Sequence, residues 1–138
     1  MQAFKSAFAE LQDKTHLIWD WNGTLLDDLD LCHAALVTQM ESCGMTPISA
    51  EEYRATFGFP IRDFYARIGF DFAKTSFESL SDQFQKLFQE RVSGGCELHA
   101  GMAELLKDLH GTGYSMWVLS AAREEVLHAQ LKSFGISG

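Results

Sequence analysis

Two apolar segments of this sequence each end in a side chain that could take part in phosphate or metal chemistry. Residues 17–21 have the length and aromatic content of a buried strand. Asp20 stands near the end of this strand, and the turn signal Asn22-Gly23 follows it. A carboxylate out of water needs a partner, and ligands of open α/β sheets bind at the carboxyl ends of strands. Asp20 is therefore predicted to be a nucleophile or a metal ligand. The alternative is a carboxylate that only caps the following turn.

The second apolar segment, residues 114–119, ends at Ser120 and precedes a predicted amphipathic helix at 124–134. A hydroxyl between a strand and a helix N-terminus is well placed to bind phosphate oxygens, together with free backbone N–H groups. The alternative is that Ser120 serves only as the N-cap of the helix. Asp20 and Ser120 thus stand at equivalent places, each beside the end of a predicted strand.

Residues 20–25, Asp-Trp-Asn-Gly-Thr-Leu, resemble the first motif of the haloacid dehalogenase (HAD) superfamily of phosphohydrolases, Asp-x-Asp-Gly-Thr-Leu. The phosphoglycolate-phosphatase-like branch fits best, and Ser120 stands where its second motif has a Ser or Thr. The sequence departs from the family pattern at Asn22, where a second aspartate is usual, and at Ala121, where Asn is typical. No residue corresponds to the lysine of the third motif or to the acidic pair of the fourth.

The resemblance implies that Asp20, Asn22 and Ser120 form the catalytic site. In the family, the first aspartate attacks phosphorus and becomes an aspartyl phosphate. Mg²⁺ is held by that carboxylate and by the backbone carbonyl two residues further on, here Asp20 and Asn22. The substrate-binding residues that the resemblance implies are Trp21, Thr24, Ser120, Ala121 and Arg62.

Arg62 belongs to a cluster of turn residues, aromatic rings and cations at 54–62, which resembles the loop that contacts the leaving group in this family. A guanidinium can pair a carboxylate through two hydrogen bonds, but an arginine on a solvent-exposed helix face is the alternative. Asp27 resembles an acid at the rim of the active site, although acids are also favoured near helix N-termini. His99 shows no ligand spacing and is interpreted as structural.

Two functions remain open from the sequence. The first is a Mg²⁺-dependent phosphomonoester hydrolase that Asn22 and the missing later motifs impair. The second is a catalytically inactive phosphate-binding or interaction domain on the same fold. An amide cannot transfer a proton, and general acid–base catalysis contributes about 10²–10⁴ in rate. Asn22 could therefore slow hydrolysis severely without abolishing phosphate binding.

The predicted fold class is α/β, a Rossmann-like HAD core with parallel strands and an inserted α-helical cap. By the resemblance, residues 1–28 and 96–138 form the core and residues 29–95 form the cap. The core is incomplete, because the family's sheet has at least five strands and only two are recognised. Two strands would leave the apolar faces of Trp19, Trp21 and Trp117 uncovered. Helices are predicted at residues 1–14, 29–43, 61–68, 77–92, 103–109 and 124–134, and from the N-cap Ser49 to a break at 58–60.

Composition restricts the partners and the location of the protein. The 138 residues carry a net charge of −8, which argues against nucleic acid as a partner. No apolar run suits a membrane span or a signal peptide, and the three cysteines show no metal-ligand pattern. We expect a cytoplasmic protein that binds a small phosphorylated metabolite and neither nucleic acid nor membrane. The oligomeric state stays open.

Overall fold

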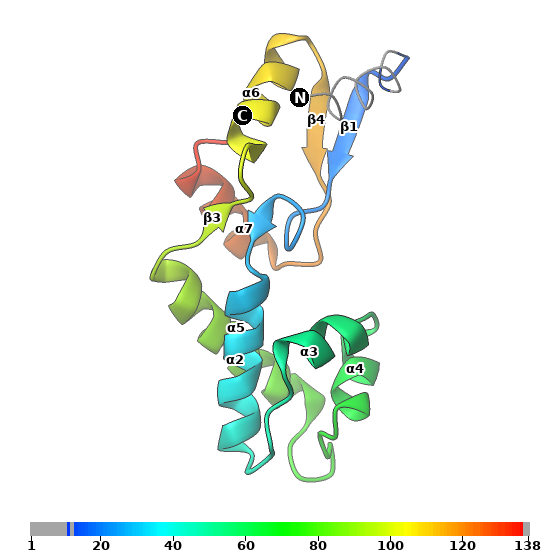
Figure 1. The fold of residues 1–138 in the computed structure, drawn as a ribbon, viewed down its shortest axis with the longest axis vertical. Coiled ribbons are helices and arrows are strands. Elements are labelled where there is room, and N and C mark those ends of the chain that lie inside the picture. Colours follow the sequence, from blue (N-terminus) through cyan, green and yellow to red (C-terminus); the bar gives the residue numbers. More distant parts are fainter. Residues whose placement is uncertain (1–10, 12, 137–138) are drawn as a thin grey trace. The chain divides into compact units, whose positions relative to one another are not determined.

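The structure is a computed structural model that describes residues 11 and 13–136 (Figure 1). It divides into two compact units. The strand unit comprises Met1–Asp27 and Leu98–Gly138, and the helical unit comprises Asp28–Glu97. The helix predicted at 1–14 lies mostly outside the described residues.

The strand unit is built on one short parallel pairing. Strand β1 (His16–Trp19) pairs with β4 (Ser115–Val118) in parallel, and Ile18 lies opposite Trp117. The parallel pairing and the surrounding helices confirm the predicted α/β class. A second pairing of two residues each joins β2 (Leu26–Asp27) to β3 (Glu97–Leu98), which hydrophobic periodicity is too coarse to predict. The helices of this unit are α6 (Met102–Gly111) and α7 (Glu124–Ser133).

The β1–β4 sheet is only half covered, so the prediction of a buried strand at 17–21 is wrong. Successive residues of both strands alternate between exposed and partly buried. Ile18 is 69% exposed and its neighbour Trp117 is 62% exposed. The expected exposure of Trp21 is also wrong, because this residue is fully buried. Trp21 lies beyond the end of β1, where the chain turns and packs its indole ring edge-on against Phe134.

The helical unit contains α2 (Leu29–Ser42), α3 (Ala50–Thr56), α4 (Ile61–Arg67) and α5 (Phe77–Ser93). These helices confirm the predicted ones to within one residue at most ends. The N-cap role of Ser49 is also confirmed, since its side chain accepts a hydrogen bond from the Glu52 backbone N–H at 3.1 Å. Helices α2 and α5 pack side by side (Figure 1). Within the described part of the chain, no helix combines the length and apolar character that crossing a membrane requires.

Candidate active site

Asp20 and Ser120 lie at the same edge of the β1–β4 sheet. The ladder of parallel pairs ends with Trp19 opposite Val118, and the Leu119 N–H donates to the Trp19 carbonyl at 2.9 Å. Asp20 follows β1 directly, and Ser120 follows β4 after Leu119. The structure therefore brings the two predicted residues to neighbouring positions at the carboxyl ends of parallel strands, where ligands of such sheets bind.

The Asp20 side chain is exposed and is hydrogen-bonded to its own loop. The Thr24 hydroxyl donates to Asp20 Oδ2 at 2.8 Å. The expected burial of this carboxylate is therefore wrong, and the turn-capping contact that the sequence left as an alternative is present. This contact does not exclude chemistry, because an ionised carboxylate can accept about four hydrogen bonds. Thr24 instead orients the Asp20 carboxylate.

The loop between β1 and β2 is compact because one carbonyl collects its backbone donors. The Trp21 carbonyl accepts from the N–H groups of Thr24, Leu25 and Leu26 at 3.3, 3.1 and 3.0 Å. Gly23 has a φ of +73°, a left-handed conformation that favours glycine. Its N–H donates to the Leu26 carbonyl at 3.0 Å. Asn22, at the turn, forms a bridge with Leu26. The backbone around Asp20 is thus tightly folded.

Ser120 does not cap helix α7. The N-cap of that helix is Arg123, whose side chain makes no capping hydrogen bond. The Ser120 Oγ instead accepts from the backbone N–H of Ala122 at 3.1 Å, within the turn before the helix. Because the oxygen acts as acceptor there, the hydroxyl proton can be donated to another group. The half-buried Ser120 side chain can therefore donate to a phosphate oxygen, and the N-cap alternative is wrong.

Trp21 has a buried side chain and cannot offer it to a substrate. Its indole N–H donates to Gln130 Oε1 at 2.7 Å, and its ring meets Phe134 edge-on with the ring centroids 6.1 Å apart. A substrate-binding role of Trp21 is thus restricted to its backbone. Gln130 is not among the residues predicted from the sequence. The available signal was its spacing, three residues after Leu127 and four after Val126 on the inward face of α7.

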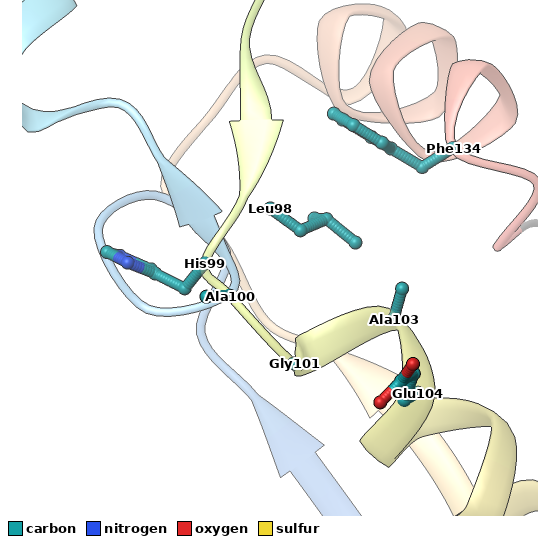
Figure 2. Close-up of a pocket in the computed structure, with 7 residues that line it drawn as sticks. All are labelled: Leu98, His99, Ala100, Gly101, Ala103, Glu104 and Phe134. Atoms are coloured by element: carbon teal, nitrogen blue, oxygen red, sulfur yellow. The ribbon is translucent and has the colours of Figure 1, made fainter.

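His99 contacts the same loop through its backbone and its ring. The His99 N–H donates to the Leu25 carbonyl at 3.0 Å. The ring Nε2 lies 3.3 Å from the Gly23 carbonyl, and Nδ1 lies 3.6 Å from Asp27 Oδ2. Figure 2 shows the ring extending toward this loop, whereas the Leu98 side chain extends into the space between Phe134 and Ala103. The segment after β3 therefore supports the loop that carries Asp20.

A model of the haloacid dehalogenase-like hydrolase family matches residues 17–138. The chain belongs to this family. Among curated proteins, no significantly similar sequence was found.

Solved structures of HAD proteins share the fold at low sequence identity. A predicted phosphoglycolate phosphatase from Haemophilus somnus has 18% identity and a TM-score of 0.72, over 88% of this chain and 58% of its own. A haloacid dehalogenase-like hydrolase from Streptococcus pneumoniae has 18% identity and a TM-score of 0.75, over 88% and 56%. A predicted phosphatase from Clostridium acetobutylicum has 17% identity and a TM-score of 0.72, over 88% and 56%. The chain thus spans less than two thirds of the length of these HAD proteins.

Arg62 lies in the helical unit of this HAD chain, whereas the other predicted site residues lie in the strand unit. It is exposed on α4, and its guanidinium carbon lies 5.1 Å from the ring centroid of Phe72 and 5.9 Å from that of Phe77. These rings hold the cation in place on the helix surface. The nearby rings of Phe57 and Phe59 are also exposed.

One cavity of the strand unit, of about 410 Å³, lies beside the N-terminus of α6 (Figure 2). Neither Asp20 nor Ser120 lines it. Its walls are largely apolar, with Leu98 and Phe134 facing the same space, so it does not suit a phosphate group. The lining residues are Leu98, His99, Ala100, Gly101, Ala103, Glu104 and Phe134.

The described residues fit part of a magnesium site. Mg²⁺ takes oxygen ligands and keeps several waters, so one or two carboxylates often suffice on the protein side. The Asp20 carboxylate and the Asn22 backbone carbonyl are oxygen donors of this kind. Over residues 11 and 13–136, no group of three or more His, Cys, Asp and Glu side chains is arranged to hold a metal ion.

Proposed function

We propose that the chain is a Mg²⁺-dependent phosphomonoester hydrolase of the phosphoglycolate-phosphatase-like type, which Asn22 slows. The observation that carries this proposal is the placement of Asp20 and Ser120 at one edge of the β1–β4 sheet. That edge offers a nucleophilic carboxylate and a hydroxyl donor together. The low-identity likeness to structures described as a phosphoglycolate phosphatase and a phosphatase supports the same class of reaction.

The proposed substrate is a small phosphorylated metabolite of the cytoplasm. Because the net charge of the chain is −8, such an anion must be attracted by local groups. Mg²⁺, held by the Asp20 carboxylate and the Asn22 carbonyl, would supply positive charge at the phosphoryl oxygens. We assign the helical unit as the cap, with Arg62 as its contact to the leaving group of the substrate.

In the proposed reaction, an oxygen of the Asp20 carboxylate forms a bond to phosphorus, and the bond between phosphorus and the ester oxygen breaks. The departing oxygen keeps the electron pair and takes a proton from solvent. Ser120 donates a hydrogen bond to a phosphoryl oxygen, and Thr24 keeps Asp20 oriented. Water then attacks the aspartyl phosphate, which releases phosphate and restores the carboxylate.

Asn22 favours a second candidate, a phosphate-binding domain without catalysis. Its amide cannot give a proton to the leaving oxygen or accept one from the attacking water. Leaving groups of low basicity need no proton donor, so aryl phosphates should pass the first step and stall as the aspartyl phosphate. Alkyl phosphates should already be slow in the first step.

A rapid-quench comparison of the full chain with its Asn22→Asp variant, with Mg²⁺ present, tests this proposal. We expect Asn22→Asp to raise turnover of aryl and alkyl phosphates by up to about 10²–10⁴-fold and to remove a burst seen with the aryl substrate. Asp20→Asn should abolish turnover in both backgrounds. Asp13→Asn, at an exposed turn before β1, is the matched control and should change neither.

Two results would count against the hydrolase. One is that the original chain shows no burst and that Asn22→Asp does not raise turnover. The phosphate-binding function would then remain, and titration with inorganic phosphate would test it. The other is undiminished turnover in Asp20→Asn, which would remove Asp20 from the mechanism.

A further inference from the structure

We propose that Gln130 is a positioning residue for the candidate active site, acting through the indole of Trp21. Gln130 lies on α7, which follows Ser120, and its amide oxygen accepts the indole N–H at 2.7 Å. The bond joins residues 109 positions apart in the sequence, from the loop after β1 to the helix after β4. As a statement about phosphate binding, this inference rests on the proposed function.

Both partners of this hydrogen bond are buried, so losing the bond should be costly. Trp21 is 0% exposed and Gln130 is 7% exposed, so water cannot easily replace either partner. A buried donor without an acceptor is costly, whereas the bond itself contributes only modestly to stability. Trp19 offers an internal comparison, since its buried indole N–H has no hydrogen-bond partner in the described structure. Of the two tryptophans that flank Asp20, only Trp21 therefore has its indole orientation fixed by a hydrogen bond.

The fixed indole controls the loop through the backbone of the same residue. The Trp21 carbonyl accepts the N–H groups of Thr24, Leu25 and Leu26. Asp20 precedes Trp21 directly and is held by the Thr24 hydroxyl at 2.8 Å. If loss of the hydrogen bond let the Trp21 side chain leave its place, the backbone of Trp21 would shift with it, tilt this carbonyl and loosen all three donors. Gln130 thereby fixes the position of the loop that carries Asp20 relative to α7, the helix that follows Ser120.

Phe134 supplies the second contact that makes this arrangement rigid. It lies four residues after Gln130 and meets the Trp21 ring edge-on, with an interplanar angle of 63°. The two residues therefore approach the same indole from one face of the end of α7. Phe134 fixes the ring by packing, and Gln130 selects its rotation by the direction of the hydrogen bond.

Hydrogen exchange of backbone amides in the full chain tests the coupling. Gln130→Met keeps the length of the side chain and removes the acceptor, whereas Gln130→Glu keeps an oxygen acceptor and serves as the conservative rescue. We expect Gln130→Met to speed exchange of the Leu25 and Leu26 amides about tenfold, the equivalent of one lost hydrogen bond. Gln130→Glu should restore slow exchange. The Leu119 amide, which donates to the Trp19 carbonyl just beyond the β1–β4 ladder, is the internal reference and should not change.

If Gln130→Met speeds exchange equally at Leu25, Leu26 and Leu119, Gln130 only stabilises the whole unit. If exchange at Leu25 and Leu26 is not faster, Gln130 does not hold the loop. Either result overturns the proposal. If Gln130→Met does not fold, the double variant Trp21→Phe with Gln130→Met removes both polar partners and takes its place. It should restore slow exchange at Leu119 while Leu25 and Leu26 remain fast. Protection recovered at all three sites would overturn the proposal.

Titration with inorganic phosphate in the presence of Mg²⁺ gives the functional readout. We expect Gln130→Met to weaken phosphate binding several-fold and Gln130→Glu to restore it. Unchanged affinity in Gln130→Met would refute the link to the site. If the original chain binds no phosphate, the proposed function fails, and the exchange rates at Leu25 and Leu26 still decide whether Gln130 positions the loop.

Discussion

The helical unit and the strand unit differ in how completely they cover their apolar side chains. The helical unit has a continuous buried core in which Phe64 and Leu80 are almost fully enclosed. In the strand unit, Ile18, Trp117 and Leu119 stand together on one face of the sheet and are 62–72% exposed. The helical unit also exposes the rings of Phe57 and Phe59, but its described residues form no exposed sheet face of this kind.

One buried polar group in each unit illustrates a second difference, although the strand unit also pairs Trp21 with Gln130. In the helical unit, the buried Gln39 donates to the Leu80 carbonyl at 2.6 Å and accepts from the Tyr65 hydroxyl at 2.8 Å. In the strand unit, the buried indole N–H of Trp19 has no hydrogen-bond partner within the described residues. Buried polar groups in stable structures are almost always paired. We infer that most of the stability of the chain resides in the helical unit.

The largest effect that tests this contrast should come from Phe64→Ala. The ring is about 1% exposed and contacts the rings of Tyr53, Phe57 and Tyr65 edge-on. Removing it should lower the free energy of unfolding by about 3–5 kcal/mol, from lost burial and a cavity. Urea unfolding followed by circular dichroism measures this. Phe59→Ala, at a ring that is 70% exposed, is the control and should cost less than about 0.5 kcal/mol.

A similar small loss for both Phe variants would mean that the helical core contributes little. The contrast between the units would then lose its energetic basis.

Alkaline pH should destabilise the helical unit by an intermediate amount. Burial raises the pKa of the Cys32 thiol above its ordinary 9.0, and the nearby Asp28 raises it further. Burial also raises the pKa of the Tyr53 and Tyr65 hydroxyls above their ordinary 10.0. The folded state therefore keeps these protons more tightly than the unfolded state does. Stability should be unaffected by these groups below pH 9 and should fall as pH rises further, by up to about 1.4 kcal/mol per pH unit for each group.

Urea unfolding at several pH values between neutral and strongly alkaline measures this slope. Cys32→Ala removes the group with the lowest ordinary pKa, so the decline should then begin at higher pH. Cys43→Ala, at an exposed cysteine, is the matched control and should leave the onset of the decline unchanged. A decline of equal onset in all three proteins would exclude Cys32 as a cause.

The helices and the motif positions could be predicted because their signals are local. The cap at Ser49 and the ends of α2 and α5 follow from residues within one turn of each end. Asp20 and Ser120 could be placed because each is next to the end of an apolar run. The family resemblance rested on the same short segments, and the family match agrees with it.

What could not be predicted depends on contacts between distant segments. The burial of Trp21 and the role of Gln130 arise from one hydrogen bond across 109 residues, which no local pattern encodes. The approach of His99 to Gly23 spans 76 residues. By contrast, the exposure of the β1–β4 face was expected at Trp117, because two strands alone leave apolar faces uncovered, and Trp117 is 62% exposed.

The smallest effect on stability should come from the exposed face of the strand unit. Ile18 is 69% exposed, so Ile18→Thr removes little buried area and keeps a β-branched side chain suited to a strand. The free energy of unfolding should change by less than about 0.5 kcal/mol. Leu26→Thr, at a fully buried position in the same unit, is the control and should cost several times more, because it places a hydroxyl in an apolar site.

Urea unfolding measures the free energy of unfolding of both variants. Sedimentation velocity should show less self-association in Ile18→Thr, because exposed apolar patches promote self-association. A loss above about 2 kcal/mol in Ile18→Thr would mean that this face is covered in solution and that the two units are more alike than their exposed areas indicate.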